Sequence, residues 1–294
     1  MRWVWTLALA AAAAGQTLNG VVDVHVHSDP DSMPRSVDAV EVARLARERG
    51  MRALLLKNHY EPTASLAWLV RKLVPGIEVF GGIALNRAVG GINPAAVERM
   101  TRVKGGWGRV VWMPTFDAEQ QVRAAGETRP FVPVGRNGEL LPEVREVLAL
   151  MAQHRLSLAT GHSSPAETLL LISEARRAGV SGVLVTHAMA SPVAMNVEQM
   201  KQAAALGAYL EFAYNSLIGA GRAYGIQECA AAIRAVGPEH CIVASDLGQA
   251  GNPLHPDGLL AFLRQLSEQG FTRAELERMS RTNPAAWLGL APAP

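Results

Sequence analysis

Cysteine, aromatic residues and net charge are all scarce in this chain of 294 residues. It has two cysteines, 5% aromatic residues and a formal net charge of +2. Cys229 falls in a helical pattern and Cys241 at the start of a strand pattern, so we expect two buried free thiols rather than a disulfide framework. The small net charge, with no basic run, argues against nucleic acid as the main partner.

Long apolar runs are missing as well, except at the N-terminus. A membrane span needs roughly 20 consecutive apolar residues, and no internal segment approaches that length, so we expect no membrane contact for the mature protein.

Residues 1–16 carry one basic residue, then apolar and small residues with Ala-x-Ala spacing, which is typical of a secretory signal peptide. This predicts cleavage near residues 14–16 and a periplasmic or secreted protein. An Ala-rich first helix or an uncleaved anchor is the alternative, and a retained N-terminus would favour the cytoplasm.

What the chain does have is a repeated alternation of strand and helix patterns. With 49% hydrophobic residues it can bury the core of one large domain, which we place at residues 17–294. Short apolar, β-branched runs separated by helical patterns lie at residues 21–27, 52–57, 77–82, 109–113, 156–160, 182–186, 208–213 and 241–245. Such an alternation predicts an α/β fold, a single-domain (β/α)8 TIM barrel. An open doubly wound sheet is the alternative, but it would more often carry a Gly-rich phosphate loop after its first strand.

One stretch is longer than a minimal barrel requires. Residues 114–142 follow the fourth strand pattern and contain several prolines and glycines. We interpret this stretch as an extended loop or small hairpin over the mouth of the barrel, a candidate lid. The alternative is a surface insertion without consequence.

The first strand pattern carries two histidines near its end. Alternation in residues 21–27 places His25 and His27 on one face, opposite three valines, and about 7 Å apart along the strand. Both imidazoles can therefore reach a single cation. The alternative is a half-buried edge strand whose polar residues face water.

Further polar residues stand at the ends of later strand patterns. Chemistry in a (β/α)8 barrel takes place at this end of the strands. The polar residues placed there by the sequence are Lys57, His59, His162, His187 and Asp246. Each alone is more often structural, but four imidazoles and a carboxylate on one rim predict a site for Zn²⁺, Mn²⁺ or Fe²⁺.

This order of ligands resembles the amidohydrolase superfamily of metal-dependent hydrolases: His-x-His on the first strand, His on the fifth and sixth, Asp on the eighth. Residues 283–290 resemble its C-terminal helix. The segments that resemble an uncharacterised amidohydrolase-like family are residues 54–60, 81–86, 89–94 and 111–115.

The resemblance implies a hydrolase in which metal-activated water cleaves an amide, ester, lactone or phosphoester bond of a small molecule, with attack at carbon preferred. It also implies that His25, His27 and Asp246 hold one metal. His162 and His187 would hold a second metal or contact the substrate. Zinc is the favoured ion, with manganese or iron as alternatives.

The number of ions depends on a bridging group that departs from the superfamily pattern. Many members have a carboxylated lysine or a glutamate at the end of the third or fourth strand, and this chain has neither there. Lys57, at the end of the second strand and on the same face as His59, is a candidate carboxylated bridge. A bare ammonium is costly at such a position, but the alternative is an ammonium that binds an anionic group of the substrate.

Other residues receive roles from their positions. Asp246 can take a proton from the attacking water and pass it to the leaving group. Glu211 shares a strand face with Tyr209 and Ala213, which can point it inward. The expected substrate contacts are His59, Arg35, Arg87 and Arg222, although loop arginines are often only solvated.

Three interpretations of function remain open at this stage, and a homo-oligomer is compatible with each. The first is the metal-dependent hydrolase. The second is a metal-dependent decarboxylase or other lyase on the same site. The third is a non-catalytic metal-binding barrel.

Overall fold

The computed structural model describes residues 16–291. The expected signal peptide, apart from Gln16, lies outside the described residues. None of the helices between residues 16 and 291 is long and apolar enough to cross a membrane. Cys229 and Cys241 are buried free thiols, as expected.

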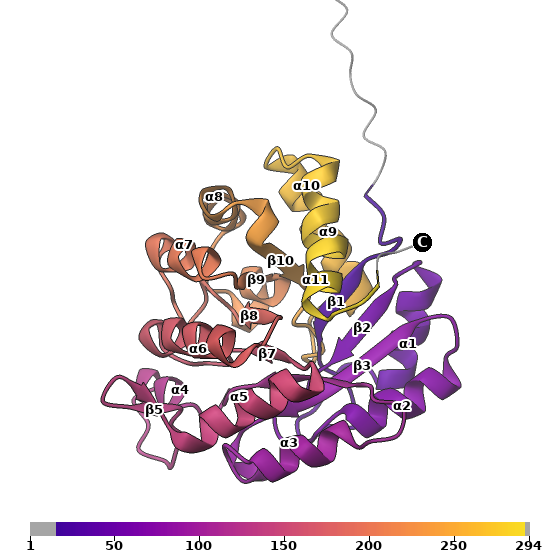
Figure 1. Ribbon diagram of the computed structural model, residues 1–294. Coiled ribbons are helices and arrows are strands. Elements are labelled where there is room, and N and C mark those ends of the chain that lie inside the picture. Colours follow the sequence, from indigo (N-terminus) through magenta and orange to yellow (C-terminus); the bar gives the residue numbers. More distant parts are fainter. Residues whose placement is uncertain (1–15, 292–294) are drawn as a thin grey trace, which may run out of the picture.

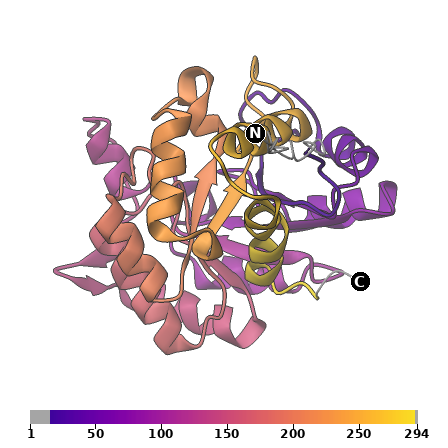
Figure 2. The ribbon, with the colours of Figure 1, turned by 90° about the horizontal axis from the view of Figure 1, so that it is seen from above.

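Eight parallel strands form one nearly closed barrel, and helices surround it (Figure 1 and Figure 2). In the order in which they pair, the strands are β1 (Val22–Val26), β2 (Ala53–Leu56), β3 (Glu78–Ala84), β4 (Gly108–Trp112), β7 (Ser157–Ala159), β8 (Val183–Val185), β9 (Tyr209–Ala213) and β10 (Cys241–Ala244). Just beyond the ends of β10 and β1 the ring is joined by hydrogen bonds from Asp246 N to His25 O, 2.9 Å, and from His27 N to Leu247 O, 3.0 Å. The predicted (β/α)8 barrel is confirmed.

Helices connect successive strands and lie on the outside of the barrel. The α-helices are α1 (Ala39–Glu48), α2 (Ala64–Leu73), α3 (Pro94–Thr101), α4 (Glu119–Ala124), α5 (Pro142–His154), α6 (Pro165–Ala178), α7 (Val197–Ala205), α8 (Ile226–Val236), α9 (His255–Glu268), α10 (Arg273–Glu277) and α11 (Asn283–Trp287). Short 3₁₀ turns are η1 (Arg87–Val89), η2 (Tyr214–Leu217), η3 (Gly219–Gly221) and η4 (Pro238–His240), and a π turn, η5 (Arg278–Thr282), joins α10 to α11.

Local signals explain where several helices begin. Pro94 and Pro165 stand in the first turns of α3 and α6, where a missing N–H costs nothing. Thr272 caps α10 in a capping box with Glu275. These chemically specific signals place the helix starts, and with them the loops that carry the rim residues.

The barrel interior is filled by an apolar cluster below the rim. Its larger members include Leu55, Phe80, Trp112 and Ile242, and Trp287 of α11 packs with them. The Trp287 indole N–H donates to Leu158 O at 3.3 Å, so α11 is held against β7. Because this cluster occupies the interior, the buried histidines and Asp246 gather above it, at the C-terminal ends of the strands.

A β-bulge in β1 departs from the regular alternation expected there. Asp23 pairs with Leu54, but Val26 pairs with Leu56. An advance of three residues along β1 therefore matches an advance of two residues along β2, so β1 contains one extra residue. Val24 accordingly packs in the inner cluster while Val26 packs in the outer one. The expectation that three valines share the face opposite the histidines is therefore wrong. The extra residue turns His25 and His27 toward the mouth, a known use of bulges at barrel rims.

Residues 114–142 follow β4 and include one helix and a small hairpin. The helix is α4, and the hairpin is the two-stranded ribbon of β5 (Gly135–Arg136) and β6 (Glu139–Leu140). The Arg129 guanidinium donates to Asp117 Oδ1 at 2.7 Å and to Phe116 O at 2.6 Å, which ties the two sides of the loop together. That the segment moves as a lid stays a prediction.

Candidate metal centre

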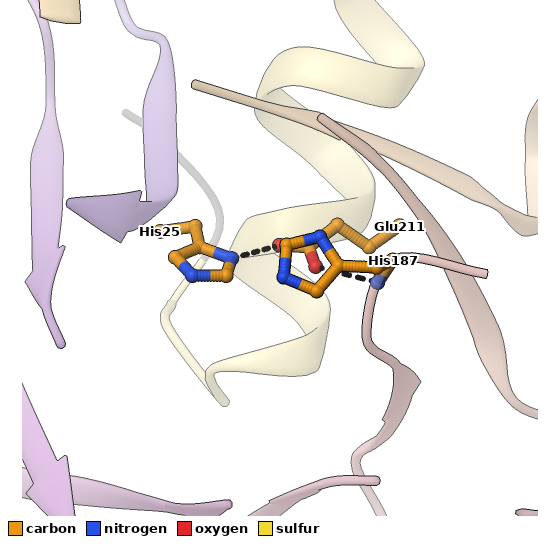
Figure 3. Close-up of side chains that lie close together, drawn as sticks. All are labelled: His25, His187 and Glu211. Atoms are coloured by element: carbon orange, nitrogen blue, oxygen red, sulfur yellow. Dashed lines mark hydrogen bonds and ion pairs between the residues drawn. The ribbon is translucent and has the colours of Figure 1, made fainter. Parts of the chain in front are cut away.

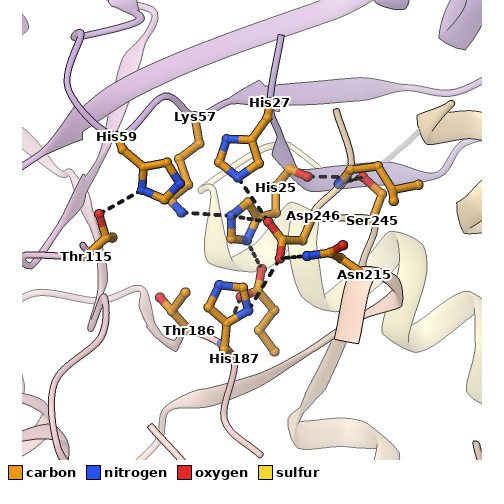
Figure 4. Close-up of polar contacts among 12 residues, drawn as sticks. His25, His27, Lys57, His59, Thr115, Thr186, His187, Asn215, Ser245 and Asp246 are labelled. Atoms are coloured by element: carbon orange, nitrogen blue, oxygen red, sulfur yellow. Dashed lines mark hydrogen bonds and ion pairs between the residues drawn. The ribbon is translucent and has the colours of Figure 1, made fainter. Parts of the chain in front are cut away.

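Three potential metal ligands converge where β1 and β10 end. The Nε2 atoms of His25 and His27 each lie 3.0 Å from Asp246 Oδ1 (Figure 4). One ligand atom from each residue lies within 4.8 Å of the other two, so one ion can be shared by all three. All three residues are buried. Two imidazole nitrogens and a carboxylate oxygen are a donor set that suits zinc, manganese or iron.

The backbone at this rim adopts an uncommon conformation. Asp246 has φ of 51° and His187 has φ of 48°, both in the left-handed region that non-glycine residues seldom enter. Each residue lies just past the end of its strand, β10 or β8. The turn aims the side chains inward, and such conformations concentrate at functional sites.

Glu211 on β9 sets the orientation of His25. The Nδ1 atom of His25 lies 2.9 Å from Glu211 Oε1 (Figure 3). An ionised carboxylate only accepts hydrogen bonds, so Nδ1 carries the proton and Nε2 presents its lone pair. Glu211 Oε2 also accepts the backbone N–H of His187 at 3.1 Å. Glu211 is 1% exposed and forms, with His25 and His187, a second group able to hold an ion.

The charges around His25 favour a cation at its Nε2 atom. Burial lowers the pKa of His25, but the carboxylates of Asp246 and Glu211 outweigh burial and raise the pKa to about 9. A bare imidazole nitrogen facing a carboxylate oxygen at 3.0 Å is stabilised only by positive charge between or beside them. A proton, an ammonium group or a metal ion each supplies it, so the residues present fit a divalent ion.

Lys57 supplies one such charge. Its Nζ atom lies 2.9 Å from His25 Nε2, and the residue is 0% exposed. Burial lowers the pKa of Lys57 to about 8, although Asp246 and Glu211 act in the opposite direction. The lysine singled out from the sequence therefore does reach the group of potential ligands.

His162 and His187 complete the ring of imidazoles. The His162 Nδ1 atom lies 2.8 Å from Gln121 Oε1, and its Nε2 is buried with no hydrogen-bond partner in the described part of the chain. His187 Nδ1 is 3.7 Å from Asp246 Oδ2. The ring centroids of His162 and His187 are 5.4 Å apart. Burial lowers the pKa of both histidines, so both are neutral and able to coordinate at pH 7.

The expected substrate-binding residues differ in where they lie. His59 belongs to the cluster: its ring stacks on His27 with centroids 4.9 Å apart. Arg35 is held by Asp31, with 2.6 Å between guanidinium and carboxylate, and its charge contributes to lowering the pKa of Lys57. Arg87 and Arg222 are exposed, and within residues 16–291 their side chains make no hydrogen bond or ion pair with the cluster.

Several polar residues that hydrogen-bond to the site were not predicted individually from the sequence. Asn215 Nδ2 donates to Asp246 Oδ2 at 3.2 Å. Asn86 and Thr115 hold His59, and Gln121 holds His162. Asn86 and Thr115 do lie in segments 81–86 and 111–115, which resemble the amidohydrolase-like family, and that was the signal that could have found them.

Comparison with protein families gives one match. A family model described as "Family of unknown function (DUF6282)" matches residues 20–211. The matched range runs from the start of β1 to Glu211 on β9, and Asp246 lies beyond it. No curated protein matches the sequence.

Comparison with solved structures gives many similar barrels. An amidohydrolase from Pseudomonas aeruginosa has a TM-score of 0.63 at 13% identity, covering 92% of this chain and 95% of its own. The organophosphorus hydrolase from Deinococcus radiodurans has a TM-score of 0.61 at 13% identity, covering 92% of each chain. A protein engineered for organophosphate hydrolysis from a weak promiscuous lactonase template has a TM-score of 0.62 at 14% identity, covering 95% of this chain and 98% of its own.

Identities this low show a shared fold alone. The fold that the neighbours share with this chain is the (β/α)8 barrel, which is the fold that the resemblance to the amidohydrolase superfamily implies. The match to a family of unknown function agrees with the narrower resemblance to an uncharacterised family.

Proposed function

This chain belongs to a family of unknown function (DUF6282), and we propose that it is a metal-dependent hydrolase of small molecules. The observation that carries the proposal is the convergence of His25, His27 and Asp246 within 4.8 Å. They stand at the end of the barrel where enzymes of this fold carry out their chemistry. The hydrolases among the structural neighbours support the same activity.

The three converging residues would hold the ion, and Glu211 would keep His25 in the tautomer that coordinates through Nε2. A divalent ion bound there would lower the pKa of a water molecule and polarise the carbonyl or phosphoryl oxygen of the substrate. Zinc suits the imidazole-rich donor set best, and manganese and iron are the alternatives.

Asp246 is the proposed proton acceptor. Burial raises the pKa of Asp246, but His25 and His187 outweigh burial and keep that pKa well below its usual range. The carboxylate is therefore ionised at neutral pH. Oδ1 faces the two imidazoles of β1, and Oδ2 accepts from Asn215 on the other side. One oxygen can bind the ion while the other takes the proton of the attacking water and returns it to the leaving group.

We propose that Lys57 acts as an ammonium and that the site holds one ion. Its Nζ is already 2.9 Å from His25 Nε2, and the side chain is 0% exposed. A carboxylated lysine would carry three more heavy atoms beyond Nζ, where the ring of His25 already makes contact. The positive charge beside the site would bind an anionic group of the substrate or balance the charge of the two carboxylates.

Metal analysis of the full-length protein, purified without chelator, tests the proposal. We expect one ion per chain in the wild type and in His154→Ala, which removes an exposed histidine on α5. We expect loss of the ion in the double variant His25→Ala/His27→Ala. Two ions in the wild type, falling to one or none in Lys57→Ala, would instead support a carboxylated bridge. Failure of the wild type to take up added Zn²⁺ or Mn²⁺ would overturn the hydrolase proposal.

The metal-loaded protein is then assayed on 4-nitrophenyl esters, γ-lactones, 4-nitroanilides and 4-nitrophenyl phosphoesters. We expect turnover of at least one carbonyl substrate, lost on treatment with a chelator and restored by the metal. A metal-loaded protein that cleaves only phosphoesters would contradict the preference for attack at carbon.

A further inference from the structure

His59 has a fixed ring plane beside the candidate metal centre. It follows β2 and is 5% exposed. Its ring lies between His27, with centroids 4.9 Å apart at 20°, and Phe116, with centroids 4.0 Å apart at 26°. Stacking on both sides fixes the plane of the ring, and the hydrogen bonds at its edge then decide which nitrogen faces the site.

Asn86 determines the donors and acceptors at that edge. Its Oδ1 accepts two backbone N–H groups, from Thr115 at 2.9 Å and Asp117 at 3.1 Å. Its Nδ2 donates to His59 O at 2.7 Å and to Thr115 Oγ1 at 2.6 Å. All four bonds agree with one orientation of the amide, because both Nδ2 hydrogens are used and Oδ1 receives only donors.

The hydroxyl of Thr115 then fixes the proton of His59. Thr115 is 0% exposed, and its Oγ1 already accepts from Asn86. The remaining partner of this hydroxyl within residues 16–291 is His59 Nδ1, at 2.9 Å. A buried O–H without an acceptor is costly, so the hydroxyl donates to Nδ1. The neutral ring of His59 therefore carries its proton on Nε2.

This tautomer is the reverse of that at two neighbouring histidines. The Nδ1 atoms of His25 and His162 face side-chain oxygens, so the Nε2 atoms of these two residues present lone pairs to the site. Figure 4 shows the second ring nitrogen of His59 on the side that faces Lys57 and the cluster. An N–H group at this point repels a metal ion and attracts an oxygen that carries negative charge.

We infer that His59 donates a hydrogen bond from Nε2 to the substrate oxygen that gains negative charge during hydrolysis, and that Asn86 and Thr115 are positioning residues for it. The inference rests on the proposed function, since it needs a substrate at the metal centre. The ring stays neutral throughout and gives up no proton. Preorganised donors of this kind stabilise the transition state without reorganisation, and a tetrahedral phosphonate oxyanion is the matching ligand.

Nuclear magnetic resonance of histidine-labelled protein tests the tautomer without any assay of activity. Long-range ¹H–¹⁵N correlations of ¹⁵N-histidine protein distinguish protonated from bare ring nitrogens, and His59→Gln identifies the His59 signals by their loss. We expect a bare Nδ1 and a protonated Nε2. Thr115→Val, which removes the hydroxyl, is expected to abolish this preference, and Thr115→Ser to retain it. A proton on Nδ1 of His59 in the wild type would overturn the inference.

Binding of methylphosphonate to zinc-loaded protein tests the donor. His59→Leu removes the N–H, whereas His59→Gln keeps an amide N–H₂ near the position of Nε2. We expect His59→Leu to bind methylphosphonate about tenfold to a hundredfold more weakly than the wild type. His59→Gln and the exposed-site control His154→Ala are expected to stay within a few-fold of the wild type.

Zinc content separates this inference from the proposed function. All three variants should retain the wild-type zinc content, because His59 is not a ligand. Loss of zinc in His59→Leu, or unchanged affinity for methylphosphonate, would overturn the donor role. A wild type that binds no metal would overturn the proposed function, and the tautomer measurement would still decide the orientation of His59.

Discussion

The carboxylate of Glu211 lies 2.9 Å from Nδ1 of His25, and this contact determines which nitrogen of His25 faces the candidate metal centre. Glu211 also accepts the backbone N–H of His187. One side chain of β9 thus fixes a ligand on β1 and the turn after β8. A single buried carboxylate therefore links these three strand ends.

Replacing Glu211 by Gln is therefore expected to weaken metal binding while preserving shape. The amide can donate to His25 Nδ1 and favour the wrong tautomer, and loss of such an orienting carboxylate typically costs 10–100-fold in metal affinity. Competition with a zinc chelator measures the effect. Glu198→Gln is the matched control, because Glu198 lies exposed on α7 and forms an ion pair with Lys201, far from the cluster's hydrogen bonds. Equal zinc affinities in the two variants would contradict the orienting role.

Asp246→Asn tests the proposed proton acceptor. The amide keeps the size of the side chain and one oxygen for the ion, but it cannot take a proton at neutral pH. We expect kcat for the best substrate of the panel to fall roughly 10²–10⁴-fold, measured on samples matched for zinc content. Asp257→Asn, at an exposed position paired with Arg49, should leave kcat unchanged. A loss of zinc with unchanged kcat per bound ion would make Asp246 a ligand only.

Arg129 is expected to control the mobility of residues 114–142. Its guanidinium donates to Glu127, and two further hydrogen bonds hold Phe116 and Asp117. The Phe116 ring in turn stacks on His59. Arg129→Ala should speed hydrogen exchange in residues 114–134 and lower stability by only about 1 kcal/mol, because the Arg129 side chain is partly exposed.

Arg102→Ala is the control for this loop. Arg102 pairs with Glu98 at the end of α3, outside residues 114–134. Mass spectrometry of deuterium uptake compares the two variants. Equal deuterium uptake by residues 114–134 in the two variants would show that Arg129 does not hold the loop.

Most of the barrel could be predicted because its signals are local. Each strand is a short run of apolar, β-branched residues, and its position follows from the run itself. The helix starts at Pro94, Pro165 and Thr272 are likewise set by residues within one turn. The start of α1 shows the limit: Ser36 and Asp38 are both side chains that can cap a helix, and in the structure Asp38 does so, accepting from both Val40 N and Glu41 N.

The details that decide chemistry are non-local and could not be predicted. The bulge in β1 appears only in its pairing with β2, since alternation alone assigns every valine to one face. The tautomer of His59 depends on Asn86 and Thr115, which lie on two other connections between strands and helices. The role of Glu211 requires that the barrel closes, so that β9 lies two strands away from β1 across β10. A list of polar residues at strand ends gives the members of the site but not their hydrogen bonds.

His255 is predicted to make stability depend on pH. It is 0% exposed, lies 2.7 Å from Leu247 O through Nε2, and its Nδ1 is buried without a partner in residues 16–291. Burial lowers the pKa of His255 from 6.5 to about 4. Below pH 6.5 His255 becomes protonated in the unfolded chain, but in the folded chain it stays neutral until about pH 4. Protonation therefore stabilises the unfolded state. The contribution of His255 to the free energy of unfolding is complete above pH 6.5 and is lost as the pH falls toward 4.

The expected loss from His255 between pH 7 and pH 4.5 is about 2 kcal/mol, at about 1.4 kcal/mol for each unit of pKa shift. Urea unfolding of metal-free protein at these two pH values measures it. The other buried histidines also contribute, with the same sign where burial lowers the pKa and with the opposite sign for His25, whose pKa is raised. The test is therefore the difference between the wild type and His255→Gln, which keeps a donor toward Leu247 O but cannot become protonated. We expect a smaller loss of stability in His255→Gln than in the wild type, while His154→Gln, at an exposed position, should behave as the wild type does. The same loss in His255→Gln and the wild type would show that His255 is not the group that titrates.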